Sequence, residues 1–62
     1  MKNIIMQNYD KGLILTFVMK VGQLYLFSDE DGEEHAYTYT EIRWLSRLSE
    51  SNRKAFNEIM EG

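Results

Sequence analysis

Apolar residues alternate with other residues over the first two thirds of the chain, in short runs that are separated by turn residues. The clearest run spans 13–20. Alternate positions of an extended strand point to opposite faces, and mostly apolar residues occupy both faces of this run: Leu13, Leu15, Phe17 and Met19 on one, and Ile14, Thr16 and Val18 on the other. A strand with two apolar faces is typical of the centre of a sheet or of an interface.

Two neighbouring runs predict strands on either side of it. Residues 3–9 form the weaker one, because Asn and Gln dilute its apolar character. Residues 23–28 alternate clearly, with Leu24 and Leu26 on one side and Tyr25 and Phe27 on the other. Short turns at 9–12 and 21–22, each containing a glycine, connect these runs.

A fourth strand is predicted over 33–39, with His35, Tyr37 and Tyr39 on one face. The segment before it, 29–32, is a strong hairpin signal. Its Asp31-Gly32 pair supplies the left-handed backbone that a tight turn between two strands needs.

The last third of the chain has helical spacing. Thr38 or Thr40 can cap the start, and Thr38-x-x-Glu41 fits a capping box. Apolar residues then recur at Ile42, Leu45 and Leu48 and, after a second candidate cap at Ser49 or Ser51, at Ala55, Phe56, Ile59 and Met60. The pattern predicts one helix kinked near 48–51 or two helices in a hairpin, and we favour two.

Together these elements predict an α+β fold: an antiparallel β-meander of three to four strands packed against one or two C-terminal helices. The 62 residues are about half the usual domain length, so we expect a single small domain spanning 1–62. An apolar content of 44% is too high for a disordered tail.

The composition excludes several ways of stabilising so short a chain. The sequence has no cysteine and one histidine, so it lacks the residues for a disulfide framework, a thiolate metal site or a histidine-based zinc site. Small scaffolds without these devices commonly rely on a partner subunit. We therefore expect a homodimer. We also expect the apolar surface that the chain cannot bury within itself to contact another protein.

Negative charge is concentrated in one segment. The net charge is −3, yet residues 29–40 carry five carboxylates and no lysine or arginine. An EF-hand would require its glycine at position six, and counting back from Gly32 puts Phe27 where the loop needs an aspartate, so that motif is absent. A looser cation site and a solvated hairpin tip both fit these carboxylates, and we favour the solvated tip.

The same carboxylates also fit a third interpretation. Side chains at i and i+2 of an extended strand lie about 6.5–7 Å apart, which is comparable with successive phosphates along a nucleic-acid strand. Asp29, Asp31 and Glu33 have this spacing. A protein that presents such a row can occupy the basic groove of a DNA-binding enzyme, with charge steering its approach.

Two other functions have candidate residues in the sequence. His35 beside Glu33 and Glu34 resembles a general base with an orienting carboxylate, but no nucleophile, second acid or oxyanion donor accompanies it, so we do not expect an enzyme or a cofactor. The second alternative is a small nucleic-acid-binding regulatory protein that uses a basic helical face. Its candidate residues are Arg43, Arg47, Arg53 and Lys54, with Trp44 as a stacking aromatic.

Three segments resemble one family. They are Leu24-Tyr25-Leu26-Phe27-Ser28-Asp29-Glu30-Asp31-Gly32, then Tyr37-Thr38-Tyr39, then Thr40-Glu41-Ile42-Arg43-Trp44-Leu45. Over residues 24–45 the chain resembles the short acidic phage-encoded inhibitors of uracil-DNA glycosylase. Those proteins are dimeric non-enzymes that imitate DNA, setting acidic side chains where phosphates would lie.

The resemblance implies a set of partner-binding residues. The phosphate-like groups would be among Asp29, Asp31, Glu33 and Glu41, and the apolar contact would be Ile42, with Tyr39 or Trp44 nearby. The implied function is a small acidic inhibitor or adaptor that acts on a host protein, most concretely a DNA-mimicking inhibitor of uracil-DNA glycosylase. The apolar patch at 4–6 is too short for a signal-peptide core and no run approaches a membrane span, so we expect a cytoplasmic protein.

Overall fold

The computed structural model describes residues 3–61 and contains a four-stranded antiparallel sheet followed by two helices. The strands are β1 (Ile5–Asn8), β2 (Leu13–Val21), β3 (Leu24–Ser28) and β4 (Glu34–Thr38), and they lie side by side in chain order. The helices are α1 (Tyr39–Ser46) and α2 (Glu50–Glu61). The predicted α+β meander is therefore confirmed, with four strands and two helices.

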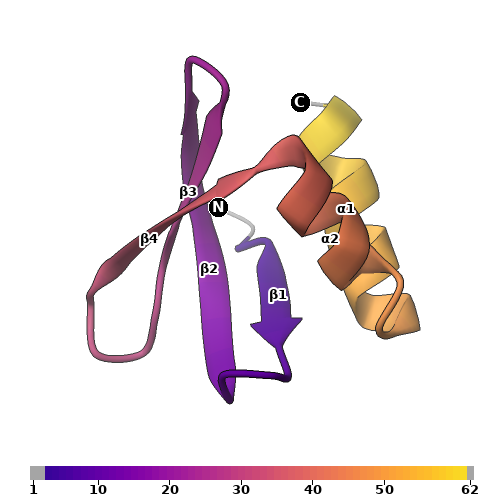
Figure 1. The fold of residues 1–62 in the computed structure, drawn as a ribbon, viewed down its shortest axis with the longest axis horizontal. Coiled ribbons are helices and arrows are strands. Elements are labelled where there is room, and N and C mark those ends of the chain that lie inside the picture. The colour runs from indigo at the N-terminus through magenta and orange to yellow at the C-terminus, as the bar shows by residue number, and fades with distance from the viewer. Residues whose placement is uncertain (1–2, 62) are drawn as a thin grey trace.

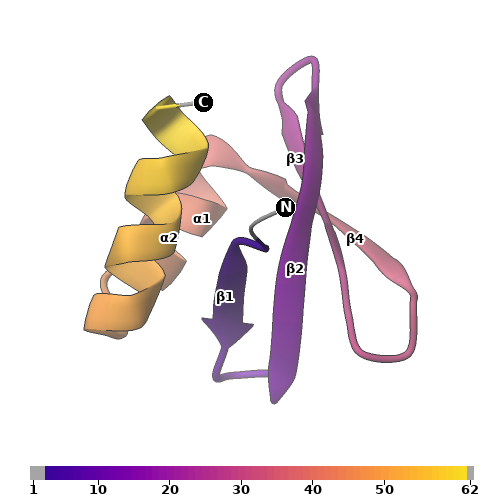
Figure 2. The ribbon, with the colours of Figure 1, turned by 180° about the vertical axis from the view of Figure 1, so that it is seen from behind.

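Both helices lie on one side of the sheet, next to β1, and the opposite sheet face carries no helix (Figure 1). In both views the β3–β4 turn lies at the side of the molecule away from the helices (Figure 2). The core lies between the helices and the sheet face toward them. Its buried apolar residues are Met6, Leu15, Tyr25, Phe27, Tyr37, Ile42, Leu45, Ala55 and Ile59.

Three predicted strands were too wide. The first strand covers Ile5–Asn8 rather than 3–9, the third Leu24–Ser28 rather than 23–28, and the last Glu34–Thr38 rather than 33–39. The second strand extends one residue further than predicted, to Val21. Tyr39 was expected on the fourth strand but begins α1, because Thr38 caps that helix and ends the extended chain there. The Asp31-Gly32 turn is confirmed, with Gly32 at φ +86°.

The predicted faces of β2 are right up to Phe17 and wrong beyond it. Phe17 pairs with Phe27, but the next pair is Met19 with Leu26, so Val18 is an additional residue in a β-bulge. The bulge reverses the alternation. Met19 therefore lies on the face away from the helices, and Lys20, paired with Tyr25, lies on the face toward them.

Hydrogen bonds at the helix starts resolve the alternatives that the sequence left open. Thr38 Oγ1 accepts from the Glu41 backbone N–H at 3.3 Å, and Glu41 Oε1 accepts from the Thr38 N–H at 2.9 Å, which completes the capping box. Ser49 Oγ accepts from the Asn52 N–H at 3.0 Å, so Ser49 rather than Ser51 caps the second helix. Leu48, expected on the apolar helical face, lies in the connection and is 37% exposed.

Candidate protein-binding site

The acidic turn (residues 29–34) is organised around Asp29. One carboxylate oxygen of Asp29 accepts the backbone N–H groups of Asp31 and Glu33 at 2.9 and 3.0 Å. The other accepts from His35 Nε2 at 2.7 Å. The hydrogen bond from His35, helped by the two backbone donors, lowers the pKa of Asp29 below its ordinary value. The side chain of Asp29 is only 7% exposed, so it holds the turn together and presents little surface to a partner.

The remaining carboxylates of the turn face solvent. Asp31 and Glu33 are exposed, as the phosphate-like interpretation requires, and their neighbours Glu30 and Glu34 are exposed as well. Negative charge at the turn is therefore carried by four accessible side chains. The hydrogen-bonded side chain of Asp29 fixes the backbone from which they project.

The turn also contains the group of side chains best placed for a cation. Among residues 3–61, ligand atoms of Asp29, Glu33 and His35 lie within 4.8 Å of one another. The Asp29 oxygens already accept three hydrogen bonds from the turn itself. The carboxylate of Asp29 thus stabilises the hairpin through hydrogen bonds within the turn. These bonds are consistent with the solvated tip that we favoured from the sequence.

A groove lies between the β1–β2 turn and α1, with a volume of about 370 Å³. We call it the α1 groove; its lining residues are Asn8, Asp10, Lys11, Tyr37, Thr40, Glu41, Trp44 and Leu45. Trp44 is 49% exposed, whereas Tyr37 and Leu45 belong to the core. The groove thus joins an accessible indole to buried apolar groups, and two carboxylates, of Asp10 and Glu41, line it as well.

The groove is held in place by hydrogen bonds that sequence reasoning missed. Asn8 is buried, and its side-chain amide donates to the Tyr37 hydroxyl at 3.2 Å. Its carbonyl oxygen accepts from the Lys11 backbone N–H at 3.3 Å. One side chain therefore joins β1, β4 and the β1–β2 turn. A polar residue at the end of a weak strand gave no signal of this role.

The structure separates the predicted partner-binding residues into two groups. Glu41 and Trp44 line the α1 groove, whereas Tyr39 begins the same helix, is 44% exposed and packs against the ring of Phe56 on α2. Asp31 and Glu33 lie at the other end of β4, away from the helices (Figure 1). The strand between the two groups spans roughly 13 Å, or two i, i+2 steps of extended chain.

Ile42 does not have the accessible position that an apolar contact requires. Its side chain is fully buried beneath α1, since the helical period turns it toward the sheet. The exposed apolar surface near the start of α1 belongs to Tyr39 and Trp44 instead. The helical spacing of apolar residues in the sequence placed Ile42 on the apolar face of the helix. That spacing predicted its position better than its proposed role as an apolar contact did.

The basic residues of the alternative interpretation are also divided. Arg43 and Arg47 lie on or just after α1 and, with Trp44 and Thr40, line a shallow hollow of about 180 Å³. Arg53 lies on α2, with its guanidinium 3.8 Å from the Glu50 carboxylate. Neither α1 nor α2 combines the length with the apolar character that a membrane-spanning helix needs.

Comparison with protein-family models, with curated proteins and with solved structures finds no match to this chain.

Proposed function

We propose that this protein is a small acidic protein-binding module, an inhibitor or adaptor rather than an enzyme, that acts in the cytoplasm on another protein. Its most concrete form is a DNA-mimicking inhibitor of uracil-DNA glycosylase. The observation that carries the proposal is the α1 groove, which combines an apolar interior with carboxylates. Such a groove suits an apolar side chain that projects from a positively charged surface.

The acidic turn supplies the second part of the proposed interface. Asp31 and Glu33 are exposed on a backbone that Asp29 holds rigid. A backbone held by these hydrogen bonds loses little conformational freedom on binding, and the exposed carboxylates steer a basic partner from a distance. A partner that contacts both regions must span the length of β4. The DNA-binding groove of an enzyme has such an extended shape.

The proposal includes a homodimer, for which the sheet provides a surface. We call the sheet face away from the helices the outer face; its exposed apolar residues include Ile5, Ile14, Met19, Val21 and Leu24, each 39–52% exposed. Several exposed apolar residues on one face of a sheet are typical of interaction sites. A second copy of the chain would cover it with an equally apolar face.

A glycosylase assay tests the function directly. Excision of uracil from an oligonucleotide by a bacterial uracil-DNA glycosylase should be inhibited by the protein, and inhibition should weaken as salt rises. The double variant D31K/E33K should inhibit much less than the native chain. The matched control E50K/E61K has the same change in charge on exposed residues of α2 and should retain inhibition.

The groove is tested in the same assay with Trp44. Replacing the indole by alanine should reduce inhibition, and W44F, which keeps an aromatic ring, should retain most of it. Full inhibition by both D31K/E33K and W44A would contradict the proposed interface. No inhibition by the native protein would exclude the glycosylase as the target.

A second candidate function is supported by the hollow around Trp44. Arg43 and Arg47 flank that indole, an arrangement in which a base can stack while the guanidinium groups contact phosphates. This candidate predicts a gel shift of single-stranded DNA or RNA at low salt that R43E/R47E abolishes. The absence of a shift at low salt would exclude it.

A further inference from the structure

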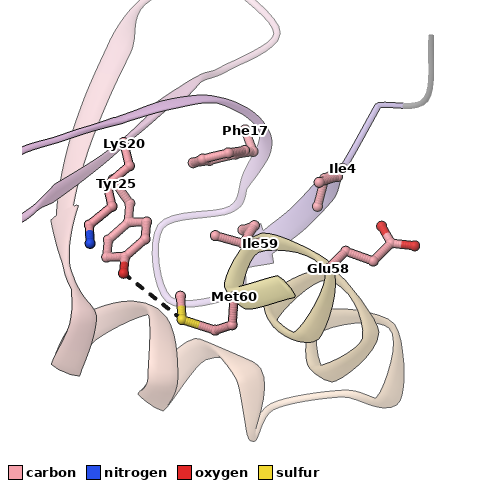
Figure 3. Close-up of a pocket in the computed structure, with 7 residues that line it drawn as sticks. All are labelled: Ile4, Phe17, Lys20, Tyr25, Glu58, Ile59 and Met60. Carbon is pink, nitrogen blue, oxygen red and sulfur yellow. Dashed lines mark hydrogen bonds between the residues drawn. The ribbon is translucent and has the colours of Figure 1, made fainter. Parts of the chain in front are cut away.

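A separate cavity shares no lining residue with the α1 groove. It has a volume of about 500 Å³ and is formed by β2, β3 and the C-terminal part of α2 (Figure 3). We call it the C-terminal pocket. Its apolar lining residues are Ile4, Phe17, Ile59 and Met60.

The bulge at Val18 brings a cation to this pocket. Without the additional residue, strand alternation would place Lys20 on the outer face. With it, Lys20 pairs with Tyr25 on the face toward the helices, and its ammonium nitrogen lies 5.3 Å from the centre of the Tyr25 ring. β-Bulges commonly re-aim side chains in this way beside functional sites.

Two hydrogen-bond donors at this end of the pocket have no strong acceptor. The Tyr25 hydroxyl is 3.9 Å from Met60 Sδ, and a thioether is a weak acceptor. No carboxylate among residues 3–61 forms an ion pair with Lys20, whose charge is met by the Tyr25 ring. Figure 3 shows the ammonium and the hydroxyl on the same side of the pocket, with Ile4 and Ile59 across from them.

We propose that the C-terminal pocket binds a small aliphatic monocarboxylate of about the size of octanoate. Its carboxylate would accept hydrogen bonds from Lys20 Nζ and the Tyr25 hydroxyl, and its chain would lie against Ile4, Phe17 and Ile59. Ligand pockets commonly measure about 300–1,000 Å³ and combine apolar walls with a few convergent polar groups, as this one does.

Lys20 and Tyr25 set the polarity of the proposed ligand, because their donors lie on one side of the pocket and Ile4 and Ile59 lie across from them (Figure 3). Glu58 also lines the pocket, and its carboxylate is turned away from Lys20. This inference is independent of the proposed glycosylase inhibition, because it involves neither the acidic turn nor the α1 groove.

Methionine methyl groups provide the test. In protein labelled with ¹³C at the methionine methyls, octanoate should shift the Met60 signal in a saturable way. Met19, which is 51% exposed on the outer face, reports non-specific adsorption and should not move in parallel. Octylammonium has the same chain with the opposite charge and should bind at least about tenfold more weakly, since it exchanges a charge-assisted contact for a repulsion.

Two variants locate the carboxylate. K20Q should weaken octanoate binding about tenfold, and Y25F, which keeps the ring, about fivefold, as expected for the loss of one charge-assisted hydrogen bond each. K11Q removes a lysine that lines the α1 groove and should leave the affinity unchanged.

Three results would overturn the proposal: equal affinity for octanoate and octylammonium, parallel shifts of Met19 and Met60, or an unshifted Met60 at roughly 10 mM octanoate, well above a Kd of about 1 mM.

Discussion

The side-chain amide of Asn52 forms two hydrogen bonds with the backbone of Gln7, forty-five positions earlier in the chain. Asn52 Oδ1 accepts from the Gln7 N–H at 2.8 Å, and Asn52 Nδ2 donates to the Gln7 carbonyl at 2.8 Å and to the Leu45 carbonyl at 2.9 Å. β1 is an edge strand, so Gln7 would otherwise leave its peptide groups without a strand partner. Asn52 supplies the hydrogen bonds that a neighbouring strand would have made, and it joins both helices to the sheet.

The variant N52A should therefore lose about 2–4 kcal/mol of unfolding free energy, because it leaves buried backbone groups of Gln7 and Leu45 without partners. Such a loss is a large part of the stability of so small a domain. Urea titration followed by circular dichroism measures it. N57A is the matched control, since Asn57 is an exposed residue of the same helix and should change stability by less than about 0.5 kcal/mol. Equal effects of the two variants would contradict the role of Asn52.

The hydrogen bonds of Asp29 predict a dependence of stability on acid. The pKa of Asp29 is lowered in the folded state, chiefly by the His35 hydrogen bond. The stabilisation is thus complete above the ordinary aspartate pKa of about 3.9 and is lost as pH falls through the lower folded value. Urea unfolding from pH 5 to pH 2 should show a shallower loss of stability in D29N than in the native chain.

D31N is the control for this experiment. Asp31 is a neighbouring aspartate of the same turn, and its side chain is exposed. Its neutralisation should leave the slope of stability against pH close to that of the native protein. A slope that changes as much in D31N as in D29N would show that net charge, rather than the hydrogen bonds of Asp29, sets the acid response.

The capping box predicts an asymmetry between two threonines. T38A removes the side-chain acceptor for the Glu41 N–H and should reduce the unfolding free energy by about 1 kcal/mol. T40A changes an exposed residue within the first turn of α1, where alanine is a better helix former, and should be neutral or slightly stabilising. Thermal unfolding of the two variants separates them, because 1 kcal/mol corresponds to about 4–8 °C in a domain of this size.

The outer face predicts the oligomeric state. Sedimentation equilibrium at tens of micromolar should give twice the 7.4 kDa chain mass. The double variant M19K/L24K places two charges on the outer face and should shift the mass to that of one chain without loss of the circular dichroism spectrum. S51K/N57K adds the same charge to exposed positions of α2 and should remain dimeric. A native protein that sediments as a single chain would exclude the dimer.

Local chemistry was predictable from neighbouring residues. The Thr38–Glu41 capping box and the Asp31-Gly32 turn depend on groups within four positions of one another, so their patterns identified them directly. The acidic turn was recognised for the same reason. The role of Asp29 within it was not, because its partners include His35 on the following strand.

The sequence by itself determined the class of fold, since strand alternation, helical spacing and caps are all local consequences of side-chain type. Only the tertiary structure decided which apolar face is covered and that Asn52 completes the edge of β1. It also decided, through the bulge at Val18, that Lys20 faces the helices. The physical reason is common to all three: each depends on a strand register or on a contact between distant segments, and a single additional residue in a strand reverses every face beyond it.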